Sequence, residues 1–190
     1  MNVRNLKCSP VSPLKARQRG IFSIEFAIVG LFFSLLLVFS GDVIIKLSVK
    51  GKLDRLSYSL VNVIKERTQL YDANLQMTDK DIDDIDVIAR HSLERTFGHY
   101  EPSNYGLVIE SQRFSGIGQA LPATHETRGH LTCQVAAPIS QLQHLSVVSV
   151  WGHQMPLYRV TLCYRTDNWF GDIVGTKFTD VSSDSIVIGR

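Results

Sequence analysis

An apolar stretch near the N-terminus, residues 21–41, limits what this chain can become. Glu25 is its only charged residue, and residues 26–41 carry no charge at all. Wound as an α-helix, a segment of this length rises about 31 Å, which matches the hydrocarbon core of a bilayer. No other segment of the chain is comparably apolar. We therefore predict that residues 21–41 form the single membrane span.

Charge is distributed unevenly around this stretch. Residues 1–20 contain five basic side chains and no acidic ones, which gives a charge of +5. Since the net charge of the whole chain is +2, residues 21–190 carry −3. Without its first 20 residues the chain is mildly acidic, and it lacks the basic footprint of a nucleic-acid-binding protein. The counts of Lys and Arg beside the span do not set its orientation, because residues 6–20 and 42–56 hold four each.

Three processing routes fit a basic segment that runs into an apolar one. A cleaved secretory signal peptide needs small residues at a cut site after the apolar stretch, and Ser40-Gly41-Asp42 matches that pattern poorly. An ordinary signal anchor would keep its basic residues. The third route is a cut ahead of the apolar stretch, after Gly20.

The residues from Gly20 to Ala27 favour this third route. A basic leader ends in Gly20, Ile21 follows, and Glu25 is the fifth residue after the glycine. Together with Phe26-Ala27 and the apolar helix behind them, they resemble the processing site of type IV prepilins. The closest likeness is to the TadE/TadF pseudopilins of the tight-adherence (Tad/Flp) pilus. The resemblance implies that a prepilin peptidase removes residues 1–20 between Gly20 and Ile21, and that Glu25, Phe26 and Ala27 act in helix packing and assembly.

Glu25 acquires a physical role from this resemblance. A carboxylate at this depth costs on the order of 3 kcal/mol unless it is paired or neutralised. In the family such a glutamate pairs with the amino terminus of a neighbouring subunit. A buried pair of this kind adds little net stability but disfavours wrong registers. The alternative is an acidic residue at a helix start, which the helix dipole favours.

Two helices are expected beyond the span itself. Residues 42–71 continue the first helix as an amphipathic half, whose apolar stripe consists of Leu53, Leu56, Leu60, Val63 and Ile64. A second helix is expected from Thr78 to Phe97, with Thr78 as its cap and Gly98 as its stop. Its predicted core face consists of Ile82, Ile85, Ile88 (or Val87) and Leu93.

The C-terminal part of the sequence predicts strands. Alternation or β-branched content marks four candidates, residues 105–114, 130–137, 156–165 and 185–190, while residues 116–129 are expected to form a loop. The resulting fold class is α+β: a long N-terminal pilin-like helix, transmembrane and then amphipathic. Residues 72–190 would form a periplasmic head of a second helix and an antiparallel sheet.

Cysteine usage bears on export and on the fold of the head. Cys8 lies in the leader and would be lost on processing. A bridge between the remaining two, Cys133 and Cys163, would stabilise the head by roughly 3–4 kcal/mol. However, Cys133 alternates with apolar residues and Cys163 with polar ones, so two strands of one sheet would direct them to different faces. The sequence favours a disulfide, with two separate thiols as the alternative.

Chemistry-bearing motifs are missing from the sequence. The six histidines form neither an H-E-x-x-H pair nor a zinc spacing with cysteine, and there is no Walker, G-x-S-x-G or G-x-G-x-x-G motif. The acidic run within residues 79–86 lacks the glycine and glutamate of an EF-hand, so we interpret it as a solvated helix start. We expect no enzymatic activity, cofactor, metal or small-molecule substrate. Aromatic side chains in or near the strands should fill the core: Tyr158, Tyr164, Trp169 and Phe170.

A functional hypothesis follows from the resemblance. It implies a minor pseudopilin, most like TadF, that acts in pilus initiation or the tip complex and supports adherence and biofilm formation. The implied partners are a TadE-like pseudopilin, the major Flp pilin, the prepilin peptidase and the inner-membrane assembly platform. The protein would cross the bacterial inner membrane once, with its leader cytoplasmic and its head periplasmic, and incorporation into the extracellular pilus is a further option. The alternative is an unprocessed bitopic inner-membrane protein with a periplasmic ligand-binding or interaction head.

Overall fold

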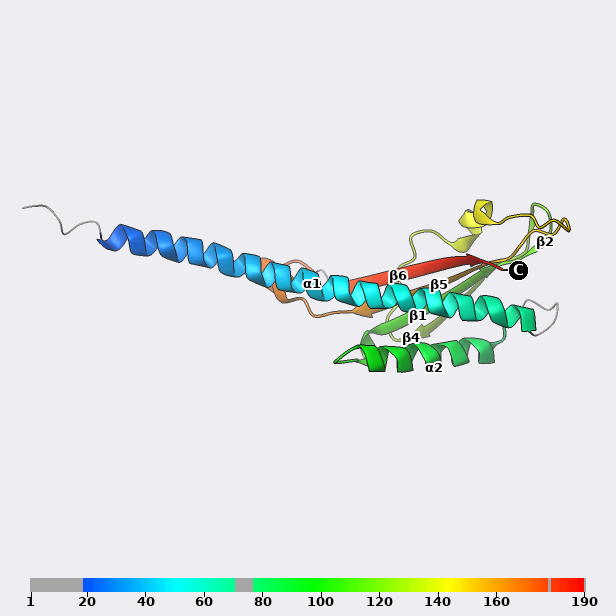
Figure 1. Cartoon of the computed structure of the whole chain (residues 1–190), viewed down its shortest axis with the longest axis horizontal. Helices are drawn as coiled ribbons and strands as arrows, with labels where there is room; N and C mark the ends of the chain where they lie inside the picture. The colour runs from blue at the N-terminus through cyan, green and yellow to red at the C-terminus, as the bar shows by residue number, and fades with distance from the viewer. Residues whose placement is uncertain (1–18, 71–76, 178, 190) are drawn as a thin grey trace, which may run out of the picture.

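A single long helix, α1 (Arg19–Leu70), forms the N-terminal part of the structure (Figure 1). The structure is a computed structural model and describes residues 19–70, 77–177 and 179–189. Most of the predicted leader, including Cys8, lies outside the described residues. The 52 residues of α1 span about 78 Å at 1.5 Å per residue. The first half of α1 projects away from the other elements, and its second half lies along the sheet (Figure 1).

The second half of α1 buries a stripe that largely follows the predicted pattern. Leu53, Leu56, Leu60 and Ile64 are buried as predicted, but Val63 is 44% exposed and Val61 is fully buried instead. At 100° per residue, Val61 and Val63 lie on opposite edges of this stripe. The head covers only the edge with Val61, and the sequence contains no signal for which edge that is.

The second helix, α2 (Asp79–Thr96), begins and ends within one residue of its prediction. Thr78 caps it: the Asp81 amide donates to the Thr78 hydroxyl, and the Thr78 amide donates to the Asp81 carboxylate. This reciprocal capping box satisfies two amides that have no partner within the helix. The predicted core positions Val87 and Ile88 are wrong, since both are more than 40% exposed. The buried face instead follows helical spacing through Ile82, Ile85, Asp86, Ala89 and Leu93.

Four antiparallel strands form the main sheet, in the order β4-β1-β5-β6. Their bounds are β1 (Tyr105–Gln112), β4 (Thr124–Gly129), β5 (Leu157–Arg165) and β6 (Asp180–Ile188). A small hairpin, β2 (Phe114–Gly116) and β3 (Gln119–Ala120), extends from one end. Short helices complete the fold: η1 (Pro102–Asn104), η2 (Ile139–Leu145) and α3 (Trp169–Val174).

One predicted strand and one predicted loop are wrong. Residues 130–137 contain no strand, and the predicted loop 116–129 contains β4. The sequence of β4, THETRG, is polar because β4 is an edge strand whose residues alternate between half-buried and exposed. Residues 130–137 are apolar because they cross over one face of the sheet. At the start of this crossing the amides of His130 and Leu131 both donate to the carbonyl of Tyr105.

The sheet is covered on both faces, but by different kinds of structure. Apolar side chains of α1 and α2 pack on one face, against Tyr105, Leu107 and Ile109 of β1 and alternate residues of β5. Residues 130–145 cover part of the other face, where Leu131 and Val135 pack around Val108 and the two cysteines. The central strands β1 and β5 are therefore buried along almost their whole length.

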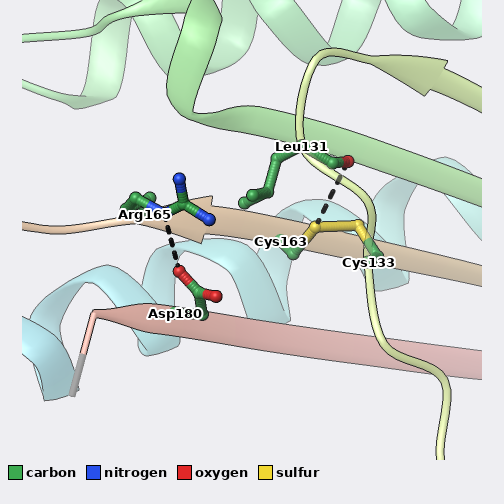
Figure 2. The surroundings of a disulfide bond; sticks show 5 residues. All are labelled: Leu131, Cys133, Cys163, Arg165 and Asp180. Carbon is green, nitrogen blue, oxygen red and sulfur yellow. Dashed lines mark hydrogen bonds and ion pairs between the residues drawn. A yellow bond between two sulfur atoms is a disulfide. The ribbon is translucent and has the colours of Figure 1, made fainter. Parts of the chain in front are cut away.

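A disulfide joins Cys133 to Cys163, as the sequence favoured (Figure 2). Cys163 lies on β5, whereas Cys133 lies on the crossing segment rather than on a strand, so the predicted conflict of faces does not arise. Gly106 on β1 faces Cys163 in the strand register. A Cβ atom at Gly106 would lie 2.0 Å from the carbonyl oxygen of Leu131. The crossing segment can approach this closely only because residue 106 has no side chain.

Candidate functional site: the projecting half of α1

The projecting half of α1 is apolar on every side. Phe22, Phe26 and Leu37 are each more than 70% exposed, and the large apolar side chains between them are also mostly exposed. Within the described part of the chain, α1 is the one helix that is long and apolar enough to cross a membrane, over Phe22–Glu66. A helix that is apolar all round is stable only when lipid or other apolar helices surround it. This half of α1 is therefore a candidate membrane span.

Glu25 lies on this projecting half and is exposed to its surroundings. The residues one helical turn away, at positions 21, 22, 28 and 29, are all apolar. No cationic side chain of the same helix therefore lies within one turn of the Glu25 carboxylate. A partner for this charge that lies within one helical turn must therefore come from a main-chain terminus or from another molecule.

Phe26 and Ala27 are also exposed, but they do not share a face with Glu25. Successive helical residues differ by 100° in direction, so these three side chains together reach around more than half of the helix. One neighbouring helix cannot contact all three. If all three act in packing, α1 must have neighbours on more than one side.

Gly20 and Ile21 belong to the first turn of α1, and their side-chain surroundings lie outside the described residues. The backbone amides of a first helical turn have no partner within the helix. A cut between Gly20 and Ile21 would remove only two residues of α1 as described, and the remaining 50 would stay continuous.

Three lysines of α1 just after the apolar stretch form polar contacts, one within the helix and two with the head. Lys46 forms an ion pair with the buried carboxylate of Asp42, one turn earlier. The Lys50 Nζ atom donates to the carbonyl of Ser182 at 3.3 Å, and the Lys52 Nζ atom donates to the carbonyl of Thr96 at 2.9 Å. The sequence showed these lysines only as charges that flank the span. The carbonyl partners of Lys50 and Lys52 are distant in sequence, so no local pattern predicted those two contacts.

Small polar residues allow α1 to lie close to β6. Ser57 is fully buried, and its hydroxyl lies 3.2 Å from that of Ser183 and 2.8 Å from that of Ser185. Ser183 also donates to Asp54. The hydroxyls satisfy one another, so a polar seam between helix and sheet leaves none of these groups unpaired.

Another buried polar group lies on the opposite face of the sheet. Arg159 on β5 donates from Nε to Glu110 on β1 at 2.6 Å, and both side chains are almost fully buried. The other carboxylate oxygen of Glu110 accepts from the Ile139 amide at 3.4 Å, at the start of η2. His125 on β4 lies 3.5 Å from the same oxygen. This arrangement fixes η2 to the sheet, and sequence inspection missed it because the partners lie on separate strands.

The aromatic residues predicted to fill the core divide into two groups. Tyr158 and Tyr164 on β5 are buried, as predicted. Trp169 is 57% exposed, so its predicted core position is wrong. Phe170 is half-buried and packs against Phe39 of α1, not into the sheet.

Metal-binding groups do not gather anywhere in residues 19–70, 77–177 and 179–189: no three His, Cys, Asp or Glu side chains lie together as a metal site requires.

Comparison with known proteins identifies one family. The family model TadF, described as "Putative tight adherence pilin protein F", matches residues 13–190. The match begins within the basic leader and includes the Gly20–Ala27 segment, α1 and the whole head. No curated protein and no solved structure is similar enough to match.

Proposed function

Since this chain belongs to the TadF family of tight adherence pilin proteins, we propose that it is a minor pseudopilin that acts in initiating a Tad pilus or in its tip complex. The observation that carries this proposal is the projecting half of α1. It is apolar on all sides, joined to a folded head, and bears one carboxylate with no cationic residue of its own helix within one turn. A long helix of this kind can move from lipid into a bundle of like helices without exposing apolar surface to water.

Processing is the first step of the proposal. A prepilin peptidase would cut between Gly20 and Ile21, which removes the five basic residues of the leader and creates an α-amino group on Ile21. In an assembled bundle, the Glu25 carboxylate would pair with the amino terminus of a neighbouring subunit. The pair would set the axial register between subunits, because a subunit shifted along the bundle axis would leave both charges unpaired in an apolar environment.

The size of the head supports a minor rather than a bulk role. Residues 72–190 follow the helix, and they are held to it by a mixed apolar and polar interface. The proposed partners are a TadE-like pseudopilin, the major Flp pilin, the prepilin peptidase and the inner-membrane assembly platform. The leader would be cytoplasmic and the head periplasmic, and the assembled pilus would support adherence and biofilm formation.

N-terminal sequencing of the protein from its native membrane, with and without the prepilin peptidase, tests the processing step. We expect a start at Ile21 that depends on the peptidase, and retention of the leader in the Gly20→Ala variant. A start at Met1 in both strains would overturn the proposal in favour of an unprocessed bitopic protein.

A count of free thiols gives a second, independent readout of the same step. The chain has three cysteines, and Cys133 and Cys163 are bonded to each other. Under denaturing, non-reducing conditions the unprocessed chain should therefore show one free thiol, that of Cys8, and the processed chain none. A count of two or more would instead show that the disulfide is absent.

Substitution of Glu25 separates processing from assembly. Glu25→Leu should be cut normally but should fail to support pili, because it removes the charge pair and not the cut site. Glu66→Leu is the matched control, since it removes an exposed carboxylate from the same helix outside the apolar stretch. Normal piliation in Glu25→Leu cells would refute the role given to this residue.

A further inference from the structure

The connection between β5 and β6 extends well beyond the sheet. It carries α3 (Trp169–Val174) along α1 toward the projecting half, on the side of the head that faces the N-terminus (orange in Figure 1). The Phe170 ring packs edge-on against Phe39 of α1, with ring centroids 5.0 Å apart. A connection that served only to join β5 to β6 could be much shorter than residues 166–179.

The contact with Phe39 fixes the height of α3 along α1. The apolar stretch of α1 ends at Gly41, and Asp42 is the first charged residue after it. Phe39 lies two residues before Gly41, which corresponds to about 3 Å along the helix axis. When the apolar stretch spans a bilayer, α3 therefore lies at the boundary between hydrocarbon and headgroups on the side of the head.

The exposed side chains of α3 have the chemistry of that boundary. Trp169 and Ile173 are each 57% exposed and Val174 is 48% exposed, although this short helix already packs on α1. The polar side of the connection is occupied by Asn168, which donates to Asp172 at 2.9 Å. Trp is enriched where membrane and water meet, because its ring is apolar and its N–H group is polar.

We propose that α3 is an interfacial anchor, which places Trp169, Ile173 and Val174 in the headgroup region of the phospholipid leaflet next to the head. The proposed occupant of this exposed surface is lipid, because the contact of Phe170 with Phe39 places α3 beside the end of the apolar stretch. Two contacts with the membrane, the span and α3, would fix both the depth and the rotation of α1. The inference requires that α1 spans the membrane, but neither cleavage at Gly20 nor assembly into a pilus.

The two tryptophans of the chain make this testable. Trp151 is 82% exposed and lies in the turn beyond Val148, joined by the Val148–Gln154 bridge. Gln154 accepts from Gly118 of the β2–β3 hairpin, at the end of the sheet far from α3. The Trp151→Phe variant leaves Trp169 as the reporter, and Trp169→Phe leaves Trp151 as the matched control.

The full chain would be reconstituted in vesicles of phosphatidylcholine and phosphatidylglycerol, with bromine near the top or near the end of the phosphatidylcholine acyl chains. We expect bromine to quench Trp169 several-fold more than Trp151, and shallow bromine to quench it more than deep bromine. Equal, weak quenching of both tryptophans would overturn the proposal. Blue-shifted Trp169 emission without bromine quenching would also overturn it, because it would show that protein and not lipid covers Trp169.

A second variant guards against misreading a folding defect. In the Trp151→Phe background, Ile173→Asp should sharply reduce the quenching of Trp169, while Val150→Asp, at the far end of the molecule, should not. Both variants should retain the Cys133–Cys163 bond, which the free-thiol count reports. Unchanged quenching in Ile173→Asp would refute insertion of this face. The N-terminal sequence is independent of these results, so failure of the anchor is distinguishable from failure of the proposed function.

Discussion

The disulfide should account for a large share of the stability of the head. Cys133 and Cys163 are 30 residues apart in sequence. On the chain-entropy model, a crosslink of that span stabilises the folded state by about 3.6 kcal/mol at 25 °C. Folded domains are stable by only about 5–15 kcal/mol in total, so this is a substantial fraction. Both cysteines are less than 10% exposed, and replacing them adds a smaller packing loss.

Urea unfolding of the Cys133→Ala/Cys163→Ala variant measures this contribution. The full chain would be held in detergent micelles, and near-UV circular dichroism of the buried Tyr105 and Tyr158 would report unfolding of the head. With a urea dependence of about 1–3 kcal/mol per M, typical of a small domain, the predicted loss lowers the urea midpoint by about 1–4 M. Cys8→Ala, in chain that retains its leader, is the matched control and should leave the midpoint unchanged.

The size of the loss decides between two accounts of the crossing segment. A loss of less than about 1 kcal/mol would show that the crosslink hardly constrains the unfolded chain. The segment would then be held mainly by the amides of His130 and Leu131, which both donate to the Tyr105 carbonyl, and by the packing of Leu131 and Val135. Reduction of the unmodified chain should reproduce the loss seen in the double variant.

Three further predictions concern the sheet. Gly106→Ala places a methyl group against the backbone of the crossing segment and should cost about 1–3 kcal/mol or more in a urea titration, whereas Gly98→Ala has open space around it and should cost much less. Glu110→Gln leaves the buried Arg159 charge unpaired and should cost about 3–5 kcal/mol, while Glu110→Leu/Arg159→Met should cost less than that. The Arg165 guanidinium donates to Asp180 and lowers the pKa of that carboxyl. The pair therefore stabilises the fold above about pH 4 and loses this effect as the pH falls through the lowered pKa. Since both side chains are half-exposed, the loss should be below about 1 kcal/mol, and Asp180→Asn should remove that part of the acid dependence of the urea midpoint.

Local sequence was sufficient for the two long helices and insufficient for the short helices and the edge of the sheet. The apolar stretch and its continuation predict α1 because helical periodicity is a property of consecutive residues. Thr78 and Asp81 predict the start of α2 for the same reason. β4 escaped prediction because an edge strand needs apolar residues on one face at most, and its pairing partner supplies the rest. The aromatic residues of α3 were predicted to be core residues, because a six-residue helix is too short for its periodicity to show which side is exposed.

In the candidate site, too, the sequence revealed local patterns but not the contacts between residues that are distant in sequence. Gly20, Ile21 and Glu25 could be singled out from the sequence because their spacing is a local pattern. They lie within the residues that the family model matches, and their roles stay predictions. The contacts that fix the head on α1 were not found, because Lys50 and Lys52 donate to carbonyls far along the chain. The pairing of Cys133 with Cys163 was favoured by parity. Its geometry depended on the crossing segment, which no local pattern revealed.

The disulfide also bears on the position of α3. Cys163 is two residues from the end of β5, where Arg165 donates to Asp180 at the start of β6 at 3.0 Å (Figure 2). The two strands that carry the connection are therefore joined at their base by an ion pair, and a covalent bond holds one of them to the crossing segment. A six-residue helix is too short to be stable by itself, so its position along α1 depends on the contacts of the connection that carries it. A base that is fixed in this way allows the single aromatic contact between Phe170 and Phe39 to set where α3 lies along α1. The crosslink would then position the proposed membrane contact in addition to stabilising the head.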